Sequence, residues 1–260
     1  MGTAIEFREL SFAIPQGRLL LDTISLSIEE GTTAAILGRS GSGKTTLLRT
    51  VNRMALPTSG EILLQGKSVS TFDLIKLRRN MGYVIQETGL FPHFTVERNV
   101  GLVLEAEGRS RQDCERRSHE LLEVAGLNPA SFAKRFPHQL SGGQRQRVGL
   151  ARALAAEPEF LLMDEPLGAL DPLTRAEMQD MLRGLLSRLK MTCLLVTHDL
   201  DEALYLAQRI ILLSEGKLIA CLSPKEFIAS REPLIEAYVR AFHRGWRNAA
   251  PKIRRTERGV

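Results

Sequence analysis

The residues with the clearest chemistry form a glycine-rich run that ends in lysine and threonine. Residues 38–45 fit the pattern GxxxxGK[ST] and read Gly38, Arg39, Ser40, Gly41, Ser42, Gly43, Lys44 and Thr45, followed by Thr46. Glycines let successive backbone N–H groups point at phosphate oxygens, and a following helix adds its positive N-terminal end. We expect Lys44 to reach the β- and γ-phosphates of a nucleotide and the Thr45 hydroxyl to help hold Mg²⁺.

Polar side chains also follow three apolar runs elsewhere in the chain. Asp164 and Glu165 come after residues 160–163, Gln86 after residues 83–85, and His198 after residues 192–197. Asp164 is expected in the Mg²⁺ shell, and Glu165 is placed to orient or deprotonate an attacking water. Gln86 could bridge the metal or that water to the segment after it. His198 is expected to sense the γ-phosphate, although a histidine after a strand can also be structural.

A second glycine motif, Ser141, Gly142, Gly143 and Gln144, precedes an arginine-rich helical run. Serine is a natural N-cap, and paired glycines let the phosphate of another molecule approach the backbone closely. The plainer interpretation is an ordinary capped helix with a tight turn. The chain thus has two devices for gripping phosphate but only one lysine to complete a nucleotide site. This mismatch predicts that nucleotide is shared between two copies of the chain.

These residues need strands and helices to position them. Apolar runs predict strands over residues 32–37, 61–65, 81–85, 160–163 and 192–196, and a turn is predicted over 57–60. Helical patterns cover residues 45–53, 114–125, 144–155 and 172–189. Continuous apolar strands that alternate with helices predict an α/β protein with a mostly parallel sheet covered on both faces. A helical insert interrupts this sheet.

Composition narrows the class of protein. The chain has 260 residues, no apolar run near the roughly 20 residues that cross a bilayer, and no secretory signal pattern at its start. Three widely spaced cysteines suit neither a disulfide framework nor a metal site, which favours a reducing cytoplasm. The net charge is +5, with basic residues gathered after residue 240. That segment is either a solvated flexible tail or a contact for anionic lipid or a membrane partner.

The motifs resemble those of the ATP-binding subunits of ABC transporters over roughly residues 4–240. The pieces are GRSGSGKT at 38–45, Gln86, LSGGQRQRVGLARAL at 140–154, FLLMDEP at 160–166, LGALD at 167–171 and His198. The resemblance implies a P-loop NTPase core of the ABC ATPase type, with a helical signature-motif subdomain at about residues 87–156 and a basic tail at 241–260. It also implies that ATP and Mg²⁺ are bound, with Thr45, Gln86 and Asp164 at the metal.

The resemblance further implies how subunits assemble. Ser141, Gly142 and Gly143 would engage the γ-phosphate of ATP held by a second copy, in a head-to-tail dimer with two ATP at its interface. Asp171 would communicate between the two copies. The insert near residues 86–100 would dock a membrane permease subunit, with Phe91–Phe94 either at that contact or packed in a local core. A solute-binding protein would join through the complex, at the cytoplasmic face of the membrane, and no nucleic acid is expected.

One position departs from the family pattern. The family stacks an aromatic side chain on the adenine, and alignment places Ile14 there. Apolar contact with the base remains open to Ile14, and Phe12 could substitute through a shift in alignment. Discrimination against GTP is therefore expected to be weak.

Several runs resemble the importers of osmoprotectants such as glycine betaine, choline, carnitine or proline-like solutes. They are VNRM at 51–54, PTSG at 57–60, LRRNMGYVIQ at 77–86, GLFPH at 89–93 and LGALDPLTR at 167–175. An importer of amino acids or sulfonates is the alternative, and a soluble ABC ATPase of DNA repair or translation is a more distant one. No pair of nucleotide-sensing modules is expected after the ATPase core.

Overall fold

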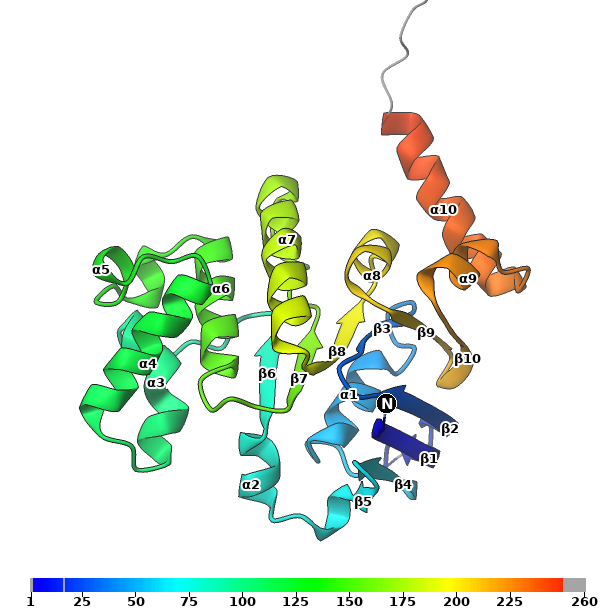
Figure 1. Cartoon of the computed structure of the whole chain (residues 1–260). Helices are drawn as coiled ribbons and strands as arrows, with labels where there is room; N and C mark the ends of the chain where they lie inside the picture. The colour runs from blue at the N-terminus through cyan, green and yellow to red at the C-terminus, as the bar shows by residue number, and fades with distance from the viewer. Residues whose placement is uncertain (1, 16, 250–260) are drawn as a thin grey trace, which may run out of the picture.

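The computed structural model describes residues 2–15 and 17–249, with side chains as far as residue 242 (Figure 1). Within these residues, the centre is a six-stranded sheet of order β10-β9-β3-β8-β7-β6. Its strands are β3 (Thr33–Leu37), β6 (Met81–Ile85), β7 (Phe160–Asp164), β8 (Thr192–Thr197), β9 (Arg209–Ser214) and β10 (Lys217–Leu222). All neighbouring pairs are parallel except β9 with β10. The predicted, mostly parallel sheet is confirmed.

A second sheet, antiparallel and of order β2-β1-β4-β5, is formed near the N-terminus. Its strands are β1 (Thr3–Ala13), β2 (Leu19–Glu29), β4 (Ser59–Leu64) and β5 (Lys67–Ser68). The turn predicted over residues 57–60 is wrong at its end, because Ser59 and Gly60 already belong to β4. A Cβ on Gly60 would lie 2.4 Å from the carbonyl oxygen of Arg8 in β1, so glycine is needed where these strands come close.

Helices cover both faces of the central sheet (Figure 1). Outside the insert, the helices are α1 (Lys44–Val51), α2 (Leu74–Arg79), α7 (Pro172–Leu189), α8 (Leu200–Leu206), α9 (Pro224–Ala229) and α10 (Pro233–Ala249), with a 3₁₀ turn at Val69–Thr71. Helix α10 packs on α8 and α9 and does not lie on the sheet. Alternate residues of β7 show the two faces. Phe160 and Leu162 pack in a cluster with α1 and the antiparallel sheet, whereas Leu161 and Met163 pack with α6 and α7. This period of two is what a strand buried on both sides requires.

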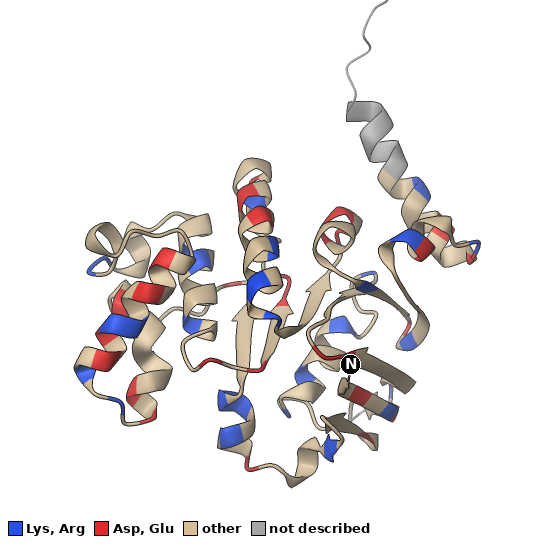
Figure 2. Cartoon of the chain, viewed as in Figure 1, with Lys and Arg blue, Asp and Glu red and all other residues tan. Residues whose placement is uncertain are grey.

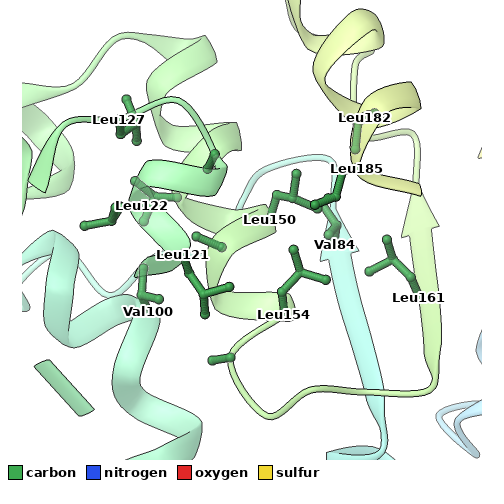
Figure 3. Packing of buried hydrophobic residues seen from close by; sticks show 14 of the residues in the cluster. Val84, Val100, Leu121, Leu122, Leu127, Leu150, Leu154, Leu161, Leu182 and Leu185 are labelled. Carbon is green, nitrogen blue, oxygen red and sulfur yellow. The ribbon is translucent and has the colours of Figure 1, made fainter. Parts of the chain in front are cut away.

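The helical insert contains α3 (Val96–Ala106), α4 (Arg111–Val124), α5 (Pro129–Phe132), a 3₁₀ turn at Pro137–Gln139 and α6 (Gly142–Ala153). All of these lie within residues 87–156, the range predicted for the insert. Helix α6 joins the insert to the sheet: Figure 3 shows Leu150 beside Val84 of β6 and Leu185 of α7, with Leu121 of α4 on the other side. One continuous apolar cluster therefore ties the second glycine motif to the nucleotide-binding core.

The charged side chains of α4 and α7 are exposed or half-buried. Figure 2 shows both signs mixed along α4 and α7, as on solvated helices. Helix α10 continues past residue 240 into the segment predicted as a basic tail, 241–260, and its residues Ile235, Tyr238 and Phe242 pack against a cluster that includes residues of α8 and α9. Arg240 pairs with Glu236 at 3.4 Å. The basic side chains of the predicted tail, 241–260, lie outside the part of the chain whose side chains are described.

Candidate functional site

The phosphate loop joins β3 to α1, and its lysine is folded back onto the loop. The Lys44 side chain is buried, and Nζ donates hydrogen bonds to the carbonyl oxygens of Gly38 at 2.9 Å and Arg39 at 3.1 Å. Burial lowers the pKa of Lys44, while the charges of Glu165 and Asp164 oppose that shift. An ammonium group held only by carbonyl oxygens can exchange them for phosphate oxygens, which carry full charge.

Glycine is required in this loop by its surroundings as well as by its ligand. Gly41 and Gly43 have φ values of 79° and 99°, in the left-handed region. A Cβ on Gly38 would lie 2.5 Å from the Leu213 carbonyl oxygen, and one on Gly43 would lie 2.5 Å from the Leu20 carbonyl oxygen. The loop is therefore pressed between β2 and β9 in the curled shape of an anion-binding nest.

Thr45 and Asp164, predicted from separate motifs to hold Mg²⁺, are in contact. The Thr45 hydroxyl donates to Asp164 Oδ1 at 2.8 Å, at the carboxyl end of β7. Hydroxyl and carboxylate oxygens are the hard donors that Mg²⁺ prefers, so the residues present fit this ion. Two neighbours of Asp164 were not predicted: Arg49 Nη2 lies 3.7 Å and the Tyr83 hydroxyl 3.5 Å from Oδ2. Arg49 follows Thr45 by one helical turn, which is the only sequence signal for it.

The two adjacent acids point in different directions. Asp164 faces Thr45, whereas Glu165 Oε2 lies 3.2 Å from Nδ1 of His198. Glu165 has a φ of 48°, and its N–H donates to the carbonyl oxygen of Val196 at 3.0 Å. This left-handed turn directs the second carboxylate away from the first. Two residues predicted to act on the γ-phosphate therefore meet at the edge of β7 and β8.

Gln86 approaches the same point from β6. A Cβ on Gly168 would lie 3.4 Å from Gln86 Nε2 and 3.7 Å from Glu165 Oε2, so both side chains converge over this glycine. The backbone carbonyl of Gln86 accepts a hydrogen bond from Nε2 of Gln146 in α6 at 2.7 Å. Gln146 was not predicted, and it links the helix of the second glycine motif directly to Gln86.

The second glycine motif begins α6 as a capping box. Ser141 Oγ accepts from the Gln144 N–H at 3.2 Å, and Gln144 Oε1 accepts from the Ser141 N–H at 2.9 Å. Ser141 and Gly142 are exposed, whereas Gly143 is buried, with its missing Cβ only 2.4 Å from Thr174 Cγ2. Figure 1 places α6 on the far side of β6 and β7 from α1. The two phosphate-gripping motifs are thus separated within one chain.

Asp171 caps α7 at the edge of the same region. Its Oδ1 accepts from the Thr174 N–H at 3.1 Å, and hydrogen bonding by Thr174 lowers the pKa of the exposed carboxyl. Arg175, one turn into α7, donates to the Leu170 carbonyl oxygen at 3.1 Å and reaches Asp199 at 3.5 Å. Arg175 was not predicted, and it connects the loop before Asp171 to the residue after His198.

The predicted docking residues are on the surface. Phe91, Pro92 and His93 are exposed, and Phe94 is half-buried beneath the guanidinium of Arg98, 3.9 Å from its ring centre. Local core packing therefore does not explain them. The buried side chain of Asn99 holds this loop by donating to the Phe91 and Phe94 carbonyl oxygens, each at 3.1 Å.

Ile14 lies half-buried just after β1, and its N–H donates to the Arg18 carbonyl oxygen at 3.0 Å. Phe12 is packed against the cluster beneath the antiparallel sheet. A cavity of about 940 Å³ opens beside the phosphate loop, lined by residues 39–42, 18–20 and 214–216 among others. The residues that line this cavity are charged, polar and aliphatic, and neither Ile14 nor Phe12 is among them.

An unpredicted acid, Glu202, is buried in the first turn of α8. Burial raises its pKa from 4.5 to about 7, although a hydrogen bond from Thr197 opposes the shift. Between these two pH values, the folded chain keeps a proton that the unfolded chain has released. The free energy of unfolding therefore falls as pH rises through this window, by about 3 kcal/mol in total.

Glu202→Gln should remove the fall in the free energy of unfolding between pH 4.5 and pH 7, because glutamine does not ionise. We expect the variant to gain stability relative to the natural chain by up to about 3 kcal/mol between pH 4.5 and pH 8. Urea unfolding at several pH values measures the difference, with Glu29→Gln, at an exposed strand end, as control. Parallel pH profiles for Glu202→Gln and the natural chain would contradict the raised pKa.

Comparison with known proteins identifies the family of the chain. The sequence profile described as "ABC transporter" matches residues 21–168, more than half of the chain. The chain belongs to the ABC transporter family. The match includes the phosphate loop, Gln86, Ser141 and Asp164, and it ends before Asp171 and His198. The predicted fold, a P-loop NTPase core of the ABC type, is confirmed.

Two relatives and one solved structure illustrate the similarity. The osmoprotectant import ATP-binding protein OsmV of Salmonella typhimurium is 44% identical over 209 residues, 80% of this chain and 55% of OsmV. The glycine betaine uptake system ATP-binding protein YehX of Escherichia coli K12 is 44% identical over 215 residues, 83% of this chain and 69% of YehX. A dimeric ATP-binding cassette bound to ADP and Pi has a TM-score of 0.77 at 34% identity, covering 85% of this chain and 98% of that one.

The matched part of this chain corresponds to little more than half the length of OsmV. Among the helices of the described residues, none has the length and apolar character needed to span a bilayer.

Proposed function

We propose that this chain is the ATP-hydrolysing, nucleotide-binding subunit of an ABC importer for a small solute, with a quaternary amine such as glycine betaine as cargo. The observation that carries the proposal is the convergence of Lys44, the Thr45–Asp164 pair and the Glu165–His198 pair at the carboxyl edge of one parallel sheet. Ligands of open α/β sheets bind at this edge.

Each side chain then has a role in hydrolysis of the γ-phosphate. Lys44 leaves its loop carbonyls to bind β- and γ-phosphate oxygens. Glu165 accepts the proton of the attacking water, and His198, 3.2 Å from it, binds the γ-phosphate. Mg²⁺, held by Thr45 and Asp164 with help from Gln86, would neutralise charge on the phosphate oxygens. Positioning and charge stabilisation supply most of the catalysis.

A second copy of the chain completes the site. Ser141 and Gly142 are exposed at the start of α6, away from their own phosphate loop, so they are available to ATP held by a partner turned head-to-tail. The similar solved cassette is dimeric and bound to ADP and Pi, which supports this arrangement. The γ-phosphate held by the partner would be contacted by the Ser141 hydroxyl and by backbone N–H groups at the N-terminus of α6.

The membrane partner is a permease that docks at the exposed Phe91–His93 surface, at the cytoplasmic face of the membrane. Because Gln146 joins α6 to Gln86, ATP-driven movement of α6 would reach the loop that carries this surface. The names of OsmV and YehX, an osmoprotectant import protein and a glycine betaine uptake protein, favour an osmoprotectant as cargo. An importer of amino acids or sulfonates is the second candidate, since the residues of a nucleotide site do not distinguish one cargo from another.

The test is to purify the chain with its membrane partner and solute-binding protein and to measure hydrolysis of Mg²⁺-ATP and Mg²⁺-GTP. We expect solute-binding protein loaded with glycine betaine, choline or carnitine to stimulate hydrolysis, and GTP to serve nearly as well as ATP. Stimulation only by amino acids or sulfonates would transfer the proposal to the second candidate. Hydrolysis without any co-purifying membrane protein would identify a soluble ATPase instead.

A further inference from the structure

The loop that carries His198 is held by two buried hydrogen bonds that meet at the hydroxyl group of Thr197. The Thr197 hydroxyl, at the end of β8, donates to Oε2 of Glu202 at 2.6 Å and accepts from the Asp199 N–H at 3.0 Å. Thr197 and Glu202 are 1% and 4% exposed. The residues on both sides of His198 are thus fixed through one hydroxyl group.

His198 itself depends on this support. Its side chain is 59% exposed, and its nearest polar partner in the described chain is Glu165. An imidazole with so little packing around it takes its position from the backbone that carries it. The backbone position is set by Thr197 and Asp199, and Thr197 is set by Glu202.

A second support for the His198 loop comes from Arg175 in α7. Glu202 Oε1 is buried without a hydrogen-bond partner among the described residues, and so is Nε of Arg175. The positive charge of Arg175 acts on Glu202, and its Nη1 lies 3.5 Å from Asp199. Arg175 also holds the Leu170 carbonyl, next to Asp171. Glu202 and Arg175 therefore support the His198 loop from two elements.

We propose that Glu202 is a positioning residue for ATP hydrolysis, which holds His198 against Glu165 and the γ-phosphate through the hydroxyl of Thr197. The inference rests on the proposed function, since it assigns Glu202 a part in that same site. Glu202 touches neither nucleotide nor water in this role. Its removal should let the loop shift, which leaves ATP bound but misplaces His198.

The test compares Mg²⁺-ATP hydrolysis by the natural assembly with that of variants at both ends of the buried bond. Glu202→Ala and Thr197→Val should lower kcat about 10- to 100-fold, with KM for ATP within about twofold. Glu202→Gln and Thr197→Ser keep an acceptor and a donor, so they should recover most of the lost rate. Asp201→Asn, at the exposed acid that precedes Glu202, is the matched control and should behave as the natural chain.

A double-mutant comparison separates positioning from general loss of structure. If Glu202 acts through His198, Glu202→Ala should change kcat less than about twofold in a His198→Ala background. Full, multiplicative loss in that background would overturn the proposal, and so would natural kcat in both Glu202→Ala and Thr197→Val. If Glu202→Ala fails to fold, Thr197→Val and its Ser counterpart decide. An inactive natural assembly would instead overturn the proposed function itself.

Discussion

Replacing Glu165 by glutamine is expected to lower kcat for ATP hydrolysis at least about 100-fold, while ATP binding is kept. Glutamine preserves the size of the side chain, but it cannot accept a proton from the attacking water. The Thr45–Asp164 contact and the Lys44 contacts do not involve Glu165, so the nucleotide and its metal keep their ligands. The variant should therefore stall after binding and accumulate as a dimer with ATP at its interface.

Two measurements follow this variant: steady-state hydrolysis, and the fraction of dimer in excess ATP by light scattering after size-exclusion chromatography. Glu159→Gln is the control. Glu159 precedes the N-terminal end of β7, away from the site, and its carboxylate accepts a hydrogen bond from Gln65 Nε2 at 3.2 Å. We expect that control to hydrolyse ATP normally. If Glu165→Gln turns over ATP at the natural rate, or stays monomeric with ATP, Glu165 is not the residue that activates water.

Local patterns predicted the elements that carry the site well. Helix α7 has the predicted bounds, and strands β6, β7 and β8 lie within one residue of theirs, because continuous apolar runs mark strands buried on both faces. The carboxyl ends of parallel strands meet at one edge, so residues that follow separate strands could be assigned to one site. In the structure, Thr45 contacts Asp164 and Glu165 contacts His198, so these residues do lie together at that edge.

The antiparallel sheet could not be predicted in the same way. Strand β1 pairs with β4 about fifty residues later, and several register shifts interrupt its alternation of apolar and polar side chains. Strand β4 reads locally like a strand of the central sheet, and only tertiary pairing assigns it to the other one. Helix α10 was not predicted at all for a related reason, since its apolar residues are recognisable only by their packing on α8 and α9.

Supporting residues of the site were missed because their roles lie in long-range contacts. Gln146, Asn99, Arg175 and Glu202 bond to backbone or side-chain groups brought near by folding, and their spacing in the sequence matches no ligand pattern. Gly143 was predicted for the approach of phosphate, but the structure shows a second need for glycine there, against Thr174. Residues expected to contact nucleotide occur in recognisable sequence motifs, whereas residues that position them through long-range contacts show no such pattern.

The second large effect is expected at the start of α6. In a Glu165→Gln background, Ser141→Ala or Gly142→Asp should weaken the ATP-dependent dimer at least about 10-fold, since a hydrogen bond to a charged group contributes about 1.5–3 kcal/mol. Aspartate at residue 142 should weaken it further by repelling the γ-phosphate. ATP affinity of the single chain should stay within about twofold, because α6 begins away from its own phosphate loop. Sedimentation with ATP measures the dimer, and titration with a fluorescent ATP analogue measures the affinity.

A matched capping box elsewhere separates this effect from loss of helix stability. Ser223 and Glu226 cap α9 as Ser141 and Gln144 cap α6, with an N–H to Oγ distance of 3.3 Å against 3.2 Å. Ser223→Ala and Ser141→Ala should each cost about 1 kcal/mol of stability, but only Ser141→Ala should impair the dimer. If Ser223→Ala and Ser141→Ala weaken the dimer equally, the effect of Ser141→Ala comes from lost helix stability and not from a contact with ATP. A loss of ATP affinity in the single Ser141→Ala chain would mean that Ser141 serves its own phosphate loop, and the shared site would be wrong.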